Sequence, residues 1–297
     1  MKSWQQRFLE AHRLQASYLD TARRYFDPLA RMLGDRQAQR GASLKVALNG
    51  SQGSGKSTLG DYLCAILKED FGLSAVALSL DDFYLTRAER AVLAENVHPL
   101  LQTRGAPGTH DVDLLRRTLD TLGQPSALPV RIPRFDKSAD DRALPEDYST
   151  CQAPVDVIIL EGWCLGARSE ASSRLVKPMN ALERDEDPSG FWRNYSNEQL
   201  RIFYEPFYDE LDFWVMLQAP GFDQVLRWRS EQEQKLRDAV RGQGAGLMDD
   251  GALLRFVQHF ERCTRQCLRD LPGSVDVLFK MDEDRRIVAV RGLEPGE

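Results

Sequence analysis

The sequence predicts an α/β fold in which a parallel sheet is covered by helices on both faces. Short apolar runs at residues 44–48, 75–80, 155–160 and 213–217 alternate with segments of helical periodicity. Strands that are apolar along their whole length are typical of a sheet buried on both faces. Such sheets bind ligands beyond the carboxyl ends of their strands. The residues that follow each strand are therefore the candidates for function.

The composition indicates a globular protein of ordinary make-up. The 297 residues are 42% hydrophobic and 28% charged, and the net charge of −6 argues against a nucleic-acid-binding scaffold, which is usually basic. No apolar stretch approaches the roughly 20 residues that span a bilayer. The N-terminus lacks the apolar core of a signal peptide. The five cysteines include no C-x-x-C pair and fit a reducing compartment. We expect a cytoplasmic protein without nucleic-acid or membrane partners.

The chain divides into a helical segment, residues 1–42, and a larger domain, residues 43–297. Aromatic and aliphatic residues from Trp4 to Met32 recur at helical spacing, which predicts that the first segment packs on the core, with a break or kink at Pro28. Further helices are predicted at 56–70, 111–122, 197–211, 222–241 and 250–271, and a C-terminal hairpin at 275–279 and 286–290. We expect residues 85–154 to form a turn-rich, substrate-side insertion. The polar composition of residues 176–190 predicts a solvated surface loop.

The first strand leads into G-S-Q-G-S-G-K-S-T, residues 50–58, followed by a predicted helix. This is the pattern G-x-x-x-x-G-K-[ST], whose dominant use is to hold a nucleoside triphosphate. Backbone amides of the loop and the positive end of the helix attract phosphate oxygens. Lys56 would reach the β- and γ-phosphates, and Ser57 would hold Mg²⁺. The predicted cofactors are ATP and Mg²⁺, bound by Gly50, Ser51, Gln52, Gly53, Ser54, Gly55, Lys56, Ser57 and Thr58.

Acidic residues follow the second and third predicted strands. Asp81 and Asp82 come directly after one strand, and Glu161 ends the other. Side chains alternate along an extended chain, so we expect only one of the two aspartates to face the phosphate loop. Transfer of phosphate to a hydroxyl needs a proton acceptor and ligands for Mg²⁺, and a carboxylate at a strand end can serve as either.

Two further segments supply cations. Residues 104–111 read R-G-A-P-G-T-H-D, and residues 133–138 read P-R-F-D-K-S with Arg142 close behind. Asp111 also stands where it would cap the helix that follows. A small anionic acceptor requires a cation for its carboxylate, for which Arg104, Lys137 and Arg142 are candidates. A nucleoside acceptor would instead use an aromatic face, such as Phe83, Tyr84 or Phe135.

Five motifs in series resemble the D-glycerate 3-kinase family, which is related to uridine kinase, phosphoribulokinase and bacterial pantothenate kinase. They are G-S-Q-G-S-G-K-S-T, S-L-D-D-F-Y-L-T, R-G-A-P-G-T-H-D, I-P-R-F-D-K-S and I-L-E-G-W-C-L-G, within about residues 44–168. The resemblance implies a three-layer, parallel-sheet P-loop kinase fold. It implies that Asp81 is the general base, that Glu161 assists Mg²⁺, and that Arg104, His110, Lys137 and Arg142 lie in acceptor-binding loops.

The same resemblance implies a lid after the fourth strand, residues 221–246, whose Arg227 or Arg229 neutralises the moving phosphoryl group. The spacing of these two arginines puts them on different helix faces. The predicted function is ATP-dependent phosphorylation of a small hydroxyl-bearing anion, D-glycerate, to 3-phosphoglycerate. Other acceptors (pantothenate, a nucleoside or a sugar phosphate) and a non-catalytic ATP-binding regulator are the alternatives. Nothing in the sequence predicts the oligomeric state.

Overall fold

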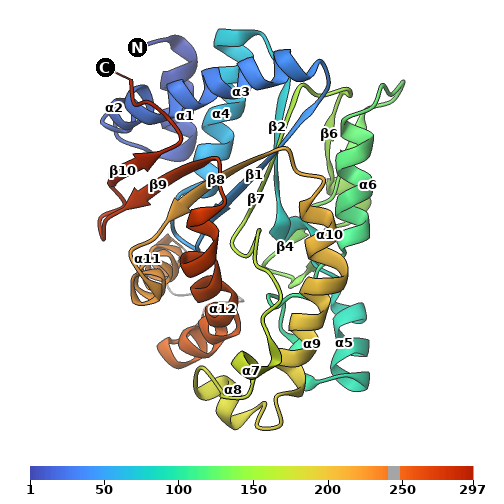
Figure 1. Ribbon diagram of the computed structural model, residues 1–297. Coiled ribbons are helices and arrows are strands. Elements are labelled where there is room, and N and C mark those ends of the chain that lie inside the picture. Colours follow the sequence, from blue (N-terminus) through green and yellow to red (C-terminus); the bar gives the residue numbers. More distant parts are fainter. Residues whose placement is uncertain (240–247, 297) are drawn as a thin grey trace.

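The computed structural model describes residues 1–239 and 248–296. Within these ranges the central sheet has six strands in the order β10–β9–β8–β1–β7–β2, of which all but β10 run parallel (Figure 1). The strands are β1 (Leu44–Gly50), β2 (Ala75–Ser79), β7 (Val157–Gly162), β8 (Phe213–Gln218), β9 (Val277–Met281) and β10 (Ile287–Arg291). The predicted parallel sheet and the C-terminal antiparallel hairpin are confirmed.

Alternate residues of the central strands pack into two separate cores, one on each face of the sheet. In β7, Val157 and Ile159 belong to the core shared with α3 and α4, whereas Ile158 and Leu160 belong to the core shared with α6 and α10. Figure 1 shows these helix pairs on opposite sides of the sheet. The three-layer arrangement follows from strands that are apolar on both faces. The helices on this sheet include α3 (Asp27–Arg40), α4 (Lys56–Phe71), α6 (Val112–Leu122), α10 (Glu205–Tyr208), α11 (Phe222–Ala239) and α12 (Asp250–Asp270). Helix α9 (Phe191–Gln199) packs away from the sheet, through Trp192 against Leu100, Leu101 and Leu182.

The N-terminal helices pack on α4. They are α1 (Ser3–His12), α2 (Tyr18–Thr21) and α3, and the π-helical turn Ala22–Phe26 separates the last two. The rings of Trp4 and Phe8 lie 5.6 and 5.3 Å from the ring of Tyr62 on α4. Tyr62 also donates a hydrogen bond of 2.6 Å to Asp27. Pro28 stands in the first turn of α3, where a missing N–H has no consequence for the helix.

The segment between β2 and β7 contains more structure than its turn-rich sequence predicts. It holds α6 as expected, together with α5 (Arg87–Asn96) and two small antiparallel pairs, β3 (Val130–Ile132) with β6 (Ser149–Cys151) and β4 (Phe135–Asp136) with β5 (Asp141–Arg142). The one fully buried side chain of helix α5 is Arg90, and Leu93, one turn later on the same face, is partly buried against Leu100 and Leu101. The start signal of this helix is local: Thr86 and Glu89 form a capping box.

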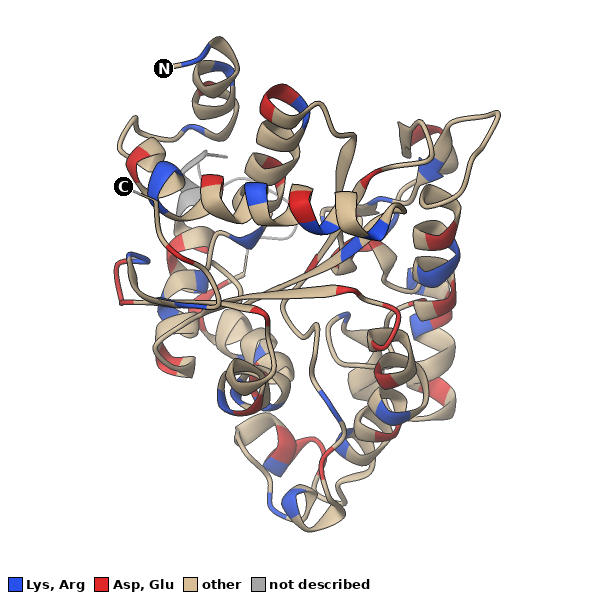
Figure 2. Ribbon diagram, turned by 45° about the horizontal axis from the view of Figure 1, so that its top comes forward, with Lys and Arg blue, Asp and Glu red and all other residues tan. Residues whose placement is uncertain are grey.

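The prediction of a solvated loop at residues 176–190 is wrong. This stretch holds α8 (Ala181–Asp185) and follows α7 (Ser172–Leu175), and two of its carboxylates are buried in ion pairs. Glu183 lies 2.6 Å from Arg262 on α12, and Asp187 lies 2.9 Å from Arg193 on α9. The segment is rich in polar residues partly because Glu183 and Asp187 form ion pairs with residues of neighbouring helices. In Figure 2, acidic and basic residues are interspersed along the helices. Within the described ranges, no helix is both long and apolar enough to cross a bilayer.

Candidate active site

The loop between β1 and α4 is shaped to receive an anion. Gly53 and Gly55 have φ angles of +79° and +88°, which residues with a side chain rarely adopt. Helix α4 begins at Lys56 without a capping side chain, so the amides of its first turn are not bound by one. The hydroxyl groups of Ser51 and Ser54 are buried, and neither has a hydrogen-bond partner among the described residues. A triphosphate would supply the missing acceptors.

Glu161 joins this loop from the neighbouring strand. In the parallel pairing of β1 with β7, Glu161 stands beside Leu48, and in that of β2 with β7 it stands beside Ser79. Ser57 Oγ donates a hydrogen bond of 2.8 Å to Glu161 Oε1, and Lys56 Nζ lies 3.5 Å from Glu161 Oε2. A buried carboxylate beside a hydroxyl and an ammonium group is suited to hold a hard cation at a phosphate.

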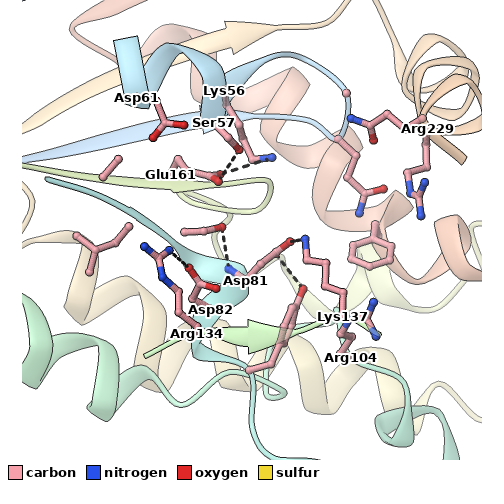
Figure 3. A pocket seen from close by; sticks show the side chains of 18 of the residues that line it. Lys56, Ser57, Asp61, Asp81, Asp82, Arg104, Arg134, Lys137, Glu161 and Arg229 are labelled. Carbon is pink, nitrogen blue, oxygen red and sulfur yellow. Dashed lines mark hydrogen bonds and ion pairs between the residues drawn. The ribbon is translucent and has the colours of Figure 1, made fainter. Parts of the chain in front are cut away.

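Asp81 and Asp82 lie in the 3₁₀ turn Leu80–Phe83, and different cations hold them (Figure 3). Asp81 Oδ2 lies 2.9 Å from Lys137 Nζ, and Asp81 Oδ1 accepts a hydrogen bond of 3.2 Å from Tyr84. Burial raises the pKa of Asp81, but the charges of Lys137 and Lys56 outweigh burial and hold this pKa at about 2. Asp81 is therefore ionised at neutral pH.

Asp82 has a different set of partners. Its carboxylate lies 2.9 Å from Arg134 Nη1 and accepts the backbone N–H of Phe135 at 3.1 Å. Burial raises the pKa of Asp82, and these two bonds oppose that effect. Both bonds tie the start of β4 to the end of β2, so Asp82 fixes the loop that carries Lys137.

These groups open onto one cavity of about 530 Å³ at the carboxyl ends of the strands (Figure 3). Its walls come from the phosphate loop, the turn after β2, the β4–β5 hairpin, α11 and α12. The residues that line it include Lys56, Ser57, Asp61, Asp81, Asp82, Tyr84, Arg104, Arg134, Lys137, Glu161, Arg229, Gln232, Phe256 and Phe260. The volume suits a small ligand.

The predicted acceptor-binding cations separate into two groups. Lys137 and Arg104 line the cavity, and Arg104 is also paired with Asp140. His110 and Arg142 are not among the cavity-lining residues of the described structure. Arg142 donates to the backbone oxygen of Tyr84 at 3.0 Å and lies 3.4 Å from Asp111. Arg142 therefore braces the segment that follows Asp81.

His110 lies behind Tyr84. Its ring stacks on the Tyr84 ring at 4.3 Å, and its Nδ1 atom lies 2.6 Å from the hydroxyl of Tyr204. Burial lowers the pKa of His110 to about 4, although the charge of Asp81 opposes this effect. The imidazole is therefore neutral at physiological pH. Asp111 caps α6 as predicted, accepting the N–H of Leu114 at 2.9 Å.

Helix α11 presents its two candidate arginines to different surroundings, as their spacing predicts. Arg229 lines the cavity and lies 3.0 Å from Glu233. Arg227 is more than half exposed and lies 3.4 Å from Glu231 and 3.7 Å from Glu283. The last part of the predicted lid, residues 240–246, lies outside the described residues.

Sequence reasoning did not single out several cavity residues. Arg134 belongs to the same motif as Lys137, so its position in the sequence could have identified it as a cavity residue. Phe256 and Phe260 are four apart on α12 and share a face, but only the fold places that face over the cavity. The sequence contained no local signal for them.

Known proteins that are similar to this chain include kinases. A scan against models of protein families finds no match. The chain is 33% identical over 242 residues to the "Uncharacterized kinase mug58" of Schizosaccharomyces pombe, covering 79% of this chain and 84% of that protein. It is 31% identical over 229 residues to the "D-glycerate 3-kinase, chloroplastic" of Arabidopsis thaliana. That match covers 73% of this chain but only 46% of the plant protein.

A solved structure resembles most of this fold. The D-glycerate 3-kinase of Cryptococcus neoformans superposes with a TM-score of 0.71 and 25% sequence identity, over 89% of this chain and 97% of that one. The chain belongs to the D-glycerate 3-kinase family of P-loop kinases.

Proposed function

We propose that this kinase transfers the γ-phosphoryl group of ATP to the 3-hydroxyl of D-glycerate. The observation that carries the proposal is that Asp81 and Lys56 line one cavity, together with cations that suit an acceptor carboxylate. A triphosphate on the phosphate loop and a hydroxyl beside Asp81 would both fit in it. The relatives named for this activity support the same acceptor.

Residues 50–58 would hold ATP. The unpartnered hydroxyls of Ser51 and Ser54, the open first turn of α4 and Lys56 fit its phosphate oxygens. Ser57 and Glu161 would hold Mg²⁺, directly or through water, and the ion supplies positive charge to the phosphates. Lys56 Nζ lies 3.5 Å from Glu161 Oε2. When ATP binds, Lys56 would instead contact the β- and γ-phosphates.

Asp81 would receive the proton of the acceptor hydroxyl. The acceptor oxygen forms a bond to the γ-phosphorus while the bond from that phosphorus to the bridging oxygen of ADP breaks, and ADP keeps the electron pair. Both oxygens of Asp81 have partners, the hydroxyl of Tyr84 and the ammonium group of Lys137. We infer that the acceptor carboxylate draws Lys137 away and so frees one oxygen of the base.

Lys137, Arg104 and Arg134 would bind that carboxylate, since all three line the cavity. His110 and Arg142 would act on the acceptor through Tyr84, which touches both of them and Asp81. Arg229 would neutralise charge on the moving phosphoryl group, with residues 221–246 as a lid over the 85–154 insertion. Arg227 would act at the surface of the same lid.

The proposal is tested by measuring ADP release with Mg-ATP and, in turn, D-glycerate, pantothenate, uridine and ribulose 5-phosphate. We expect D-glycerate to give the highest kcat/KM by a wide margin. A higher kcat/KM for another acceptor would identify that molecule as the substrate, with the same phosphoryl transfer. ATP binding without release of ADP for any of the four would favour a regulatory protein.

A further inference from the structure

The turn between β9 and β10 carries an arginine in an unfavourable backbone conformation. Arg285 has a φ angle of +65°, a region that glycine and asparagine adopt more readily. The turn is closed by hydrogen bonds from Arg285 N–H to Asp282 O (3.1 Å) and from Asp282 N–H to Arg286 O (2.9 Å). A residue that keeps its side chain under such strain commonly has a contact that requires it.

The side chain of Arg285 makes that contact with the phosphate loop. Its Nε atom donates a hydrogen bond of 2.7 Å to the backbone oxygen of Gly53, which lies 232 residues earlier in the chain. Its Nη2 atom lies 2.9 Å from Glu231 on α11. The guanidinium group also stands 4.9 Å from the ring centre of Trp228 on the same helix. One side chain thus joins the phosphate loop to α11.

Trp228 completes this joint. Its indole N–H donates a hydrogen bond of 2.9 Å to the backbone oxygen of Glu283, in the turn that carries Arg285. Its Cβ atom is so close to Gly53 that a Cβ added there would lie 2.7 Å away. The phosphate loop, the β9–β10 turn and the first half of α11 therefore pack as one unit.

We propose that Arg285 is a positioning residue for the nucleotide, a role that rests on the proposed ATP site at residues 50–58. A planar trans peptide directs its N–H opposite to its C=O, so a bond to the Gly53 oxygen fixes the plane between Gly53 and Ser54. That plane belongs to the loop that receives the phosphates. The bond to Glu231 carries the same constraint into α11, the helix of Arg229. Arg285 holds the loop in its binding shape before ATP arrives.

The test compares Arg285→Asn, Arg285→Lys and Arg286→Asn in the full chain. Asparagine accepts the left-handed backbone, so Arg285→Asn keeps the turn and removes only the side-chain contacts. Lysine retains the charge but has no planar fork to reach both partners. Arg286 is the matched control, because its side chain is 77% exposed and is paired with Asp284 at 3.6 Å. Calorimetry with Mg-ADP alone measures binding, and unfolding midpoints report the fold.

We expect Arg285→Asn to weaken Mg-ADP binding about tenfold, as the loss of a charge-assisted hydrogen bond at the loop would. We expect Arg285→Lys to fall between wild type and Arg285→Asn, and Arg286→Asn to bind as wild type. In turnover assays, KM for ATP should rise while KM for the acceptor stays the same. Equal Mg-ADP affinity in all three variants would overturn the inference. Since binding is measured without an acceptor, a wrong acceptor would leave this result standing.

Discussion

Lys137 Nζ lies 2.9 Å from Asp81 Oδ2, while the hydroxyl of Tyr84 occupies Asp81 Oδ1 at 3.2 Å. The carboxylate proposed as the general base thus has a partner on each oxygen. Its pKa of about 2 makes it a weak base for as long as Lys137 stays in place. An acceptor with its own carboxylate can compete for Lys137, and a neutral acceptor cannot. This relation links the choice of acceptor to the strength of the base.

Replacing Lys137 by methionine should shift the pH dependence of catalysis. Burial, which raises the pKa of Asp81, would then be opposed mainly by Lys56. Because a carboxylate serves as a base only when ionised, activity is lost as pH falls through its pKa. We expect the acid limb of kcat/KM to move upward by about one pH unit or more. We also expect KM for D-glycerate to rise.

Lys68→Met is the control for this shift, since Lys68 is exposed on α4. Its pH profile should match that of the wild type. An acid limb in Lys137→Met that coincides with the wild-type limb would contradict the claim that Lys137 sets the ionisation of Asp81.

The neighbouring aspartates should respond differently to the same change. Asp81→Asn removes the proton acceptor and should lower kcat by about a hundredfold or more, while Mg-ATP still binds. Asp82→Asn weakens the bonds to Arg134 and Phe135 and should lower the free energy of unfolding by about 1–3 kcal/mol, with a smaller loss of kcat. Single-turnover kinetics and urea unfolding separate the two effects. Equal kcat values for both variants would reject Asp81 as the base.

The two arginines of α11 offer a matched pair. Arg229 lines the cavity, and Arg229→Met should lower kcat by about a hundredfold or more, because a cation at the transferring phosphoryl group is lost. Arg227 is mostly exposed, and Arg227→Met should leave kcat close to the wild-type value. Steady-state kinetics at saturating ATP checks both. If Arg227→Met proves the more damaging, the other face of the helix closes over the phosphates.

The buried charges of the 176–190 region should contribute to stability and not to chemistry. Arg193 and Asp187 are almost completely buried, so Arg193→Met leaves a buried carboxylate without its ion-pair partner. We expect the free energy of unfolding to fall by about 3–5 kcal/mol. Arg184, whose partner Asp185 is exposed, is the control, and Arg184→Met should barely move the unfolding midpoint. Denaturant titrations measure the free energy of unfolding. An equal loss of this free energy in both variants would refute the assignment.

The parts of this site that the sequence predicts are the local ones. The phosphate loop and Asp81 each follow a strand, and Glu161 lies near the end of β7. Strand ends meet at one edge of a parallel sheet, so the convergence of these residues could be inferred without coordinates. Helix α4 and the C-terminal hairpin follow from periodicity and turn residues in the same way.

The parts that sequence reasoning missed depend on distant partners. Glu183 and Asp187 read as solvated because Arg262 and Arg193, which neutralise them, lie elsewhere in the chain. Arg285 reads as a turn residue because its partner Gly53 is 232 residues away. The apolar signal of helix α5 is weak, since its only fully buried side chain is the charged Arg90 and Leu93 is only partly buried. In each case a charged residue makes the buried or long-range contact, and hydrophobic periodicity does not predict such contacts.

The central claim concerns which bond is made, and phosphorus NMR of the product tests it most directly. After incubation with Mg-ATP and D-glycerate, we predict a new phosphate ester whose phosphorus couples to the two protons of a CH₂ group, as in 3-phosphoglycerate. Asp81→Asn should give almost none of it. Formation of inorganic phosphate without an ester, or an ester whose phosphorus couples to a single proton, would contradict the proposed reaction.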